Sequence, residues 1–187
     1  MEEADLIRRA RQGDDAAWEA LVELHREAVF RLGYLLLGDP HDADDVAQEA
    51  FIRAYRALKS FDTTRPLRPW LLRIATNLAR NRYRALGRYV AALRRWVQSE
   101  PETAVHAETQ TSQQMEAQVL WQAVRRLTQT DQEIIYMRYF LELSVGETAE
   151  ALDIAPGTAK SRLHRALKHL RAVVDREFPS LAEGRLA

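Results

Sequence analysis

The sequence predicts an all-α protein: two small helical domains joined by a flexible linker, the C-terminal one a helix-turn-helix. Only seven glycines and six prolines occur in 187 residues, and Ala, Leu, Arg and Glu are abundant, as in helical proteins. Apolar residues recur at steps of three and four along most of the chain. This periodicity fades in a polar segment rich in Thr and Gln. We therefore predict a first domain at 1–90, a linker at 91–114, a second domain at 115–178 and a tail at 179–187.

The composition excludes several classes of protein. The chain is 47% hydrophobic, so it can bury a core. It has no cysteine, which excludes disulfides and Cys-ligated metal or redox chemistry. No apolar run approaches the roughly 18 residues of a membrane span, and the acidic start MEEAD is not a signal peptide. We expect a soluble, cytoplasmic protein without membrane insertion.

Charge is strongly segregated although the formal net charge is zero. Lys and Arg number 8 against 13 Asp and Glu in residues 1–61, and 9 against 1 in residues 62–95. The counts are 3 against 10 in residues 96–155 and 6 against 1 in residues 156–176. Two basic blocks thus alternate with two acidic ones. Basic blocks suit polyanions, and acidic blocks suit a basic partner surface or solubility.

The first domain is expected to begin with a short helix over 3–12. Asp14 is a suitable N-cap for a long helix that ends at Leu37, before Gly38. A turn over 38–40 then leads to a helix over 42–61, with three aspartates in its first turn. The residues expected to face inward on these two long helices are Trp18, Leu21, Val22, Leu24, Ala28, Val29, Leu32, Leu35, Leu36, Val46, Ala47, Ala50, Phe51, Ala54, Tyr55 and Leu58.

The outer face of the helix over 42–61 is a candidate binding surface. It carries Asp45, Gln48, Glu49, Ile52, Arg53 and Arg56. From the pattern alone this face is either a charged solvent surface or an interface. The aspartates do not predict a metal site, because the Gly and the distal Glu of a calcium loop are missing and the acids lie on different sides of the helix.

The segment over 65–84 predicts a helix with two different faces. Leu71, Leu72, Ile74, Ala75 and Leu78 form an apolar stripe. The opposite face carries Trp70, Arg73, Asn77, Arg80, Asn81 and Arg84. It holds no acid, and it offers guanidinium groups for phosphates, an aromatic ring for stacking and two amides that can bond base edges. Taken alone, this helix is either a nucleic-acid surface or an ordinary basic helix.

The second domain is expected to contain a helix-turn-helix. Thr130 can cap one helix with Glu133 three residues on, and Ser144 can cap a short helix with Glu147 three residues on. A tight turn over 153–155 follows, and Pro156 suits the first position of a helix that runs to about residue 178. A short helix, a tight turn and a longer basic helix make the helix-turn-helix layout. Its interior is predicted to hold Ala149, Leu152, Ile154, Leu163, Ala166, Leu167 and Leu170.

The last helix carries a second candidate DNA surface, since in this motif the start of the second helix meets base edges in the major groove. The expected base contacts are Lys160, Ser161, His164 and Arg165. The expected phosphate contacts are Thr158, Arg162 and Lys168. The alternative is a basic amphipathic helix without a DNA role. His164 and His169 lack the i, i+4 spacing of a helical metal pair, so zinc is not expected.

Three segments together carry a resemblance to a known family. LGDPHDADDVAQEAFIRAYRAL, RPWLLRIATNLARNRYR and LSVGETAEALDIAPGTAKSRLHRALKHLR occur in this order around a short linker. The chain resembles bacterial RNA polymerase sigma factors of the extracytoplasmic-function (ECF) type, in the sigma-70 family. The resemblance covers nearly everything from Asp14 to Val174. It implies an alternative sigma factor that binds core polymerase, recognises −10 and −35 promoter elements and assists DNA melting without an ATP-hydrolysing motor.

The resemblance implies a role for each candidate surface. The face with Asp45, Gln48, Glu49, Ile52 and Arg53 would dock on the β′ clamp helices. The −10 element would meet Arg65, Arg68, Trp70, Arg73, Asn77, Arg80 and Asn81, and the loop over 62–68 would capture a flipped base. The helix-turn-helix would read the −35 element, and the linker would pass through the polymerase near the RNA exit path.

The resemblance also implies partners: core polymerase with its β′ and β subunits, promoter DNA and an anti-sigma factor. The chain departs from the pattern at Ala155, where a Ser would cap the recognition helix better. A conventional helix-turn-helix regulator is the alternative, but it leaves the basic surface at 65–84 unexplained. An enzyme is not expected, because the sequence lacks a phosphate-binding Gly-rich loop, HExxH and a cysteine nucleophile. No cofactor is predicted.

Overall fold

The computed structural model describes residues 2–94 and 120–178, and within these ranges the chain is helical without strands. The first part contains α1 (Glu3–Arg11), α2 (Asp15–Leu37), α3 (Pro40–Ala57), the 3-10 turn η1 (Leu58–Ser60) and α4 (Leu67–Arg94). The second part contains α6 (Gln129–Ile135), the π-turn η2 (Tyr136–Phe140), α7 (Val145–Leu152) and α8 (Pro156–Glu177). Most of the predicted linker, the start of the second domain and the tail lie outside these ranges.

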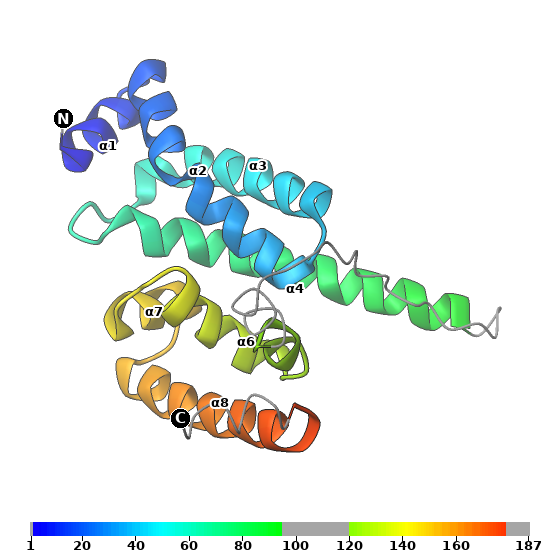
Figure 1. The fold of residues 1–187 in the computed structure, drawn as a ribbon. Helices are drawn as coiled ribbons and strands as arrows, with labels where there is room; N and C mark the ends of the chain where they lie inside the picture. The colour runs from blue at the N-terminus through cyan, green and yellow to red at the C-terminus, as the bar shows by residue number, and fades with distance from the viewer. Residues whose placement is uncertain (1, 95–119, 179–187) are drawn as a thin grey trace, which may run out of the picture.

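The first domain packs α2 against α3 and α4, with α1 on the side of α2 (Figure 1). Leu21, Leu32 and Leu72 lie in its core, each at most 1% exposed. Asp14 caps α2 by accepting a hydrogen bond from the Ala17 amide at 3.1 Å. Gly38 ends α2 at φ 76°, the left-handed region that glycine adopts without a Cβ clash. The predicted limits of this long helix are confirmed.

The third helix differs from its prediction at its start. It begins at Pro40, and Asp39 caps it by accepting from the Asp42 amide at 2.9 Å. Proline suits a first helical position because the missing N–H has no partner there. Of the three aspartates expected in the first turn, only Asp42 lies in it. The inward assignments of Tyr55 on α3 and Leu24 on α2 were also wrong, because these side chains are 43% and 59% exposed.

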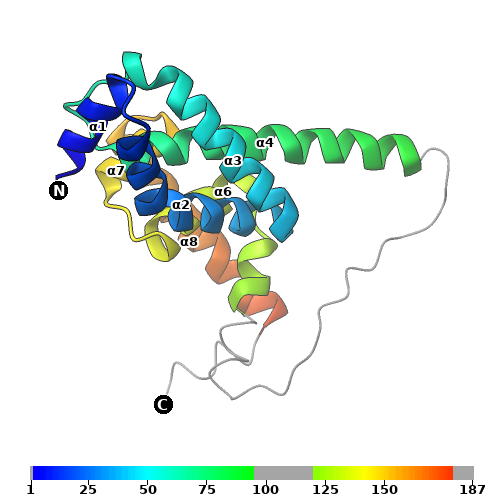
Figure 2. The ribbon, with the colours of Figure 1, turned by 90° about the horizontal axis from the view of Figure 1, so that it is seen from above.

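Helix α4 begins at Leu67, two residues later than predicted, and continues to Arg94. The later start has a local cause, because a residue that precedes a proline is disfavoured in helical conformation, and Arg65 precedes Pro66. Its apolar stripe is confirmed, with Leu71, Leu72 and Ala75 buried. The last turns of α4 project beyond the other helices (Figures 1 and 2). The helix therefore carries the backbone past the predicted domain boundary at residue 90.

The second domain has the predicted helix-turn-helix. Ser144 and Glu147 form the expected capping box at the start of α7. Asp153 ends α7 in the left-handed region at φ 57°, which Asp tolerates better than most residues. Pro156 opens α8, and Ala155 gives it no side-chain cap. Leu167, predicted to lie between the two helices, is 37% exposed.

One predicted cap in the second domain was wrong. Thr128, not Thr130, caps α6 by accepting from the Asp131 amide at 3.3 Å. Glu133 therefore does not fold back onto the helix start as a capping-box partner. It is instead turned toward the first domain, where it meets Arg80.

The two domains lie against each other. Helix α7 packs along α4, and α6 and η2 touch α2. In Figure 1, α7 and α8 lie below the layer formed by α2, α3 and α4, with α7 next to α4. This arrangement brings the helix-turn-helix over the basic face of α4.

Candidate nucleic-acid and protein interfaces

The outer face of α3 combines polar pairs with an exposed aliphatic side chain. Arg53 donates to Glu49 at 2.6 Å, and Gln48 donates to Asp44 at 2.7 Å. These i, i+4 contacts hold the polar side chains against the helix. Ile52 lies among them and is 45% exposed. An exposed isoleucine within a charged face is suited to a partner that covers it.

A groove between α2 and α3 opens beside this face. It is lined by Val22, Glu23, Arg26, Glu27, Phe30, Asp44, Ala47, Gln48, Phe51 and Ile52. Its apolar floor and charged rim are the usual composition of a protein interface. Phe30 is 37% exposed and was not among the predicted site residues. Phe30 lies outside the apolar stripe that was expected to face inward on α2, and this position could have identified it as a candidate site residue from the sequence.

The third helix is tied to α4 by one arginine. Arg82 on α4 donates to Asp42 and, at 3.0 Å, to Asp45 on α3. Asp45 is one of the predicted polymerase contacts, and Arg82 follows Asn81 of the predicted DNA face. This ion pair therefore connects the two candidate surfaces of the first domain. Arg82 was missed because its partners lie about forty positions away in the sequence.

Four arginines of the predicted −10 surface contact the second domain. Arg80 pairs with Glu133, Arg73 with Asp153 and Arg65 with Glu150. Arg68 donates to the backbone carbonyl of Leu141 at 2.9 Å. The hydrogen bonds that Arg80 donates to the Glu133 carboxylate raise the pKa of Arg80, so this guanidinium is held charged. The structure thus brings these arginines together on one face, and places acidic side chains of α6 and α7 on it.

The three uncharged residues of the predicted −10 surface have different surroundings. Trp70 is half-buried, and its ring lies 4.7 Å from that of Phe61 between centroids. Asn77 and Asn81 are exposed. Asn81 accepts from Arg84 at 2.8 Å. The two amides are therefore accessible, whereas Trp70 also contributes to the core.

The predicted −35 surface is open. Thr158, Lys160, Ser161, His164, Arg165 and Lys168 are exposed, and Arg162 is half-buried. Ser161 donates to the Thr158 carbonyl at 3.1 Å, which orients its hydroxyl along α8. Within residues 2–94 and 120–178, none of these cations forms an ion pair with a carboxylate. The start of α8 is thus a basic surface available to a polyanion.

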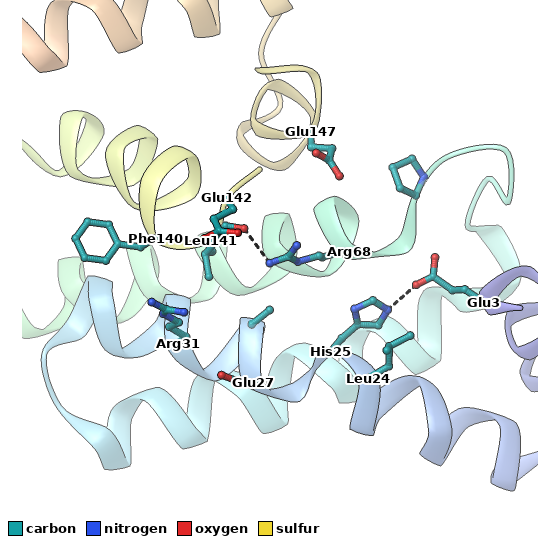
Figure 3. Close-up of a pocket in the computed structure, with 12 residues that line it drawn as sticks. Glu3, Leu24, His25, Glu27, Arg31, Arg68, Phe140, Leu141, Glu142 and Glu147 are labelled. Atoms are coloured by element: carbon teal, nitrogen blue, oxygen red, sulfur yellow. Dashed lines mark hydrogen bonds and ion pairs between the residues drawn. The ribbon is translucent and has the colours of Figure 1, made fainter. Parts of the chain in front are cut away.

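A polar pocket lies where α1, α2 and α4 meet the η2–α7 connection (Figure 3). His25 is buried at its edge, and its Nε2 lies 2.7 Å from Oε1 of Glu3. Burial lowers the pKa of His25. The charge and hydrogen bond of Glu3 act in the opposite direction, and the positive charge of Arg68 lowers the pKa further. The neutral imidazole is therefore the favoured form in the folded chain.

Acidification is expected to weaken the fold through His25. Because the pKa of His25 is lowered in the folded chain, its contribution to the free energy of unfolding is complete above the ordinary pKa of 6.5. That contribution is lost as the pH falls through the lowered pKa. Between about pH 8 and about pH 5, the free energy of unfolding should fall more for the natural chain than for His25→Gln. Urea unfolding at several pH values measures this difference. Equal pH dependence in the two chains would contradict it.

The described residues contain no group of three or more His, Cys, Asp or Glu placed to hold a metal ion. None of the described helices is both long enough and apolar enough to cross a bilayer.

Comparison with known proteins assigns both domains. Residues 21–89 match the model of Sigma-70 region 2, and residues 117–170 match Sigma-70, region 4. The chain is 34% identical over 174 residues to the ECF RNA polymerase sigma factor SigW of Bacillus subtilis, covering 88% of this chain and 92% of SigW. It is 33% identical over 172 residues to the RNA polymerase sigma factor NccH of Alcaligenes xylosoxydans xylosoxydans, covering 90% and 92%.

A solved structure is similar over nearly the whole chain. CnrH, in complex with the cytosolic domain of CnrY, matches with a TM-score of 0.70 and 25% identity, covering 94% of this chain and 98% of that chain. The family models coincide with the two helical domains, and the relatives span both. The chain belongs to the sigma-70 family of RNA polymerase sigma factors, as a member of the ECF type.

Proposed function

We propose that this chain is an alternative sigma factor that binds RNA polymerase core and directs it to promoters through two separate DNA contacts. One observation carries this function: each of the two family regions presents its own basic surface, on α4 and on α8. A conventional helix-turn-helix regulator would account for α8 alone. The chain acts in the cytoplasm as a DNA-binding initiation factor, without a catalytic step of its own.

The polymerase contact is proposed for the α2–α3 groove. Ile52 would insert between apolar side chains of the β′ clamp helices. Asp45, Gln48, Glu49 and Arg53 would form the polar rim that fixes its orientation. The groove beside Ile52 supports this proposal, because a projecting helix can lie in it.

The −10 element is proposed to bind the face of α4. Asn77 and Asn81 would bond base edges, while Arg65, Arg68, Arg73 and Arg80 would hold phosphates. The ring of Trp70 would stack on a base at the side of α4. The loop over 62–68 would take a flipped base, and melting would then follow from the capture of unpaired bases. Asp62 shapes this loop, since it accepts from both the amide and the hydroxyl of Thr64.

The −35 element is proposed to bind the start of α8. Lys160, Ser161, His164 and Arg165 would contact bases, and Thr158, Arg162 and Lys168 would contact phosphates. The exposure of these side chains supports the proposal. Phosphate contacts give affinity and register, whereas base contacts select the sequence.

An anti-sigma factor is a further proposed partner. CnrH, which is similar over nearly the whole chain, was solved with the cytosolic domain of CnrY bound to it. A protein that covers the α2–α3 groove would compete with core polymerase for Gln48 and Ile52. Simultaneous, unimpaired binding of both would contradict this competition.

The promoter assignment is tested by transcription from a genomic DNA library with bacterial core polymerase and the purified chain. Asn77 and Asn81 are the only asparagines in the sequence, so Asn77→Ala with Asn81→Ala removes both amides from α4. We expect new transcript starts that share two upstream motifs. The double variant should lose most of these starts, since a good base contact contributes about 1–3 kcal/mol.

The control is Gln122→Ala, which removes an exposed amide outside both proposed DNA faces. It should leave the pattern of starts unchanged. If the folded chain neither bound core nor produced new starts, the proposed function would be wrong. If it bound duplex DNA by itself without core, a conventional regulator would be the better account.

A further inference from the structure

We propose that a pocket between the end of α1, the end of α3 and η1 binds a free small molecule with two or more linked phosphates, of the nucleoside di- or triphosphate class. Its volume is about 380 Å³, which is within the range of small-molecule sites. None of the residues that line it is among those proposed above to contact polymerase or DNA. The site is therefore separate from the proposed sigma-factor function.

Three cations and no carboxylate line this pocket. Arg11 comes from the end of α1, Arg56 from the last turn of α3, and Lys59 from η1. In the part of the chain that the structure describes, none of the three forms an ion pair with a carboxylate. Their positive charges repel one another around the cavity, and a bound anion would relieve this repulsion.

The absence of carboxylates at this pocket contrasts with the rest of the segment. Residues 1–61 hold 8 Lys and Arg against 13 Asp and Glu. Half of these cations pair with carboxylates, namely Arg8, Arg9, Arg26 and Arg53. Among the described residues of this segment, the cations without such a pair are Arg31 and the three at the pocket. The pocket thus collects most of the unpaired positive charge of an acidic segment.

Cations near helix ends often bond the last backbone carbonyls, but this role accounts only for Arg11. Its Nη2 donates to the Lys59 carbonyl at 2.6 Å and so joins α1 to η1. The Ala10 carbonyl accepts from the Gly13 amide at 3.0 Å. The side chains of Arg56 and Lys59 make no hydrogen bond to any described residue. Their donors are therefore available to a ligand.

The lining also indicates the class of ligand. A guanidinium binds two phosphate oxygens with parallel donors, and an ammonium binds them as a point charge. Tyr55 lines the same pocket and is 43% exposed. Its ring lies 5.2 Å from that of Trp18 between centroids, which holds it in place. A phosphate chain attached to a base would use both the cations and the aromatic ring.

The test titrates ATP into the purified full chain by isothermal calorimetry, without magnesium, because Mg²⁺ would occupy the phosphate oxygens. We expect one ATP per chain, bound at least tenfold more tightly than AMP, which has the same base and a single phosphate. Arg56→Gln should weaken ATP binding about tenfold or more, since a hydrogen bond between charged groups is lost. Saturating ATP should raise the midpoint of thermal unfolding more for the natural chain than for Arg56→Gln.

Further variants keep this result specific. Lys59→Gln should weaken ATP binding as Arg56→Gln does, and both side chains are exposed, so circular dichroism should show intact helices. Arg31→Gln is the matched control, because Arg31 is an exposed arginine of the same domain outside the pocket. Lys168→Gln controls for binding to α8. Both controls should bind ATP as the natural chain does.

Several results would overturn the proposal. They are a natural chain that does not bind ATP, equal affinity for ATP and AMP, and folded Arg56→Gln and Lys59→Gln variants that both bind ATP as tightly as the natural chain. A loss in Lys168→Gln without a loss in Arg56→Gln would place the nucleotide on α8 instead.

A second probe distinguishes a free ligand from the phosphates of a DNA strand. It is a fluorescent pool of random single-stranded DNA of about 20 nucleotides, which offers a backbone without a chosen sequence. Arg56→Gln should bind this pool as the natural chain does, because the pocket lies outside the proposed DNA faces. If Arg56→Gln lost DNA binding as strongly as ATP binding, the pocket would belong to a DNA strand and the free phosphorylated ligand would be wrong.

Discussion

Replacing Ile52 with aspartate is expected to weaken binding to RNA polymerase core by about a hundredfold or more, because an unpaired charge would be buried in an apolar contact. Ile52 is 45% exposed, so the isolated chain should tolerate the change. Core binding is measured by fluorescence anisotropy of a labelled chain. Circular dichroism and urea unfolding check that the fold is intact.

Leu24→Asp is the matched control for this prediction. Leu24 is also an exposed aliphatic residue in the middle of a helix of the first domain, at 59% exposed. It lines the pocket toward the second domain and not the groove beside Ile52. We expect Leu24→Asp to retain core binding. Equal losses in both variants would show that the α2–α3 groove is not the specific contact.

Replacing Arg165 or Lys168 on α8 with alanine is expected to impair binding of the −35 element in different ways. Arg165 is assigned to a base contact. Arg165→Ala should therefore weaken binding to the preferred −35 sequence by about 1–3 kcal/mol and reduce the selectivity for one base of that element. Lys168 is assigned to a phosphate, so its loss should weaken all sequences alike and reduce the salt dependence of binding.

The measurement is transcription by the holoenzyme from promoters whose −35 element is varied one base at a time, at several salt concentrations. If Arg165→Ala weakens all variants evenly, as Lys168→Ala should, then Arg165 binds backbone and the base assignment is wrong. The comparison is informative because both side chains are exposed cations on the same helix.

Local rules predicted much of the fold. Asp14, Gly38, Ser144 with Glu147, and Pro156 each mark a helix limit through a contact that spans only a few residues. Such limits can be derived from sequence because their energies come from nearby backbone groups. The same rules correctly placed the helix-turn-helix and the apolar stripe of α4.

The remaining features depend on contacts that no local pattern encodes. Glu133 looked like a capping partner of Thr130, but it pairs with Arg80, fifty-three positions away. Trp70 fits a nucleic-acid face by spacing, yet it also packs on Phe61 across the loop. The closure of the two domains arises from several such pairs at once. It could not be derived from the periodicity of single helices.

In the free chain one face of α4 contacts the second domain, and in the transcribing complex the same face is expected to bind DNA. The direct measurement is the distance between dyes at Glu19→Cys and Ala172→Cys after the labelled chain binds core polymerase and promoter DNA. We expect a shift from short to long distances on assembly. A labelled chain that starts transcription while its domains remain at the short distance would contradict it.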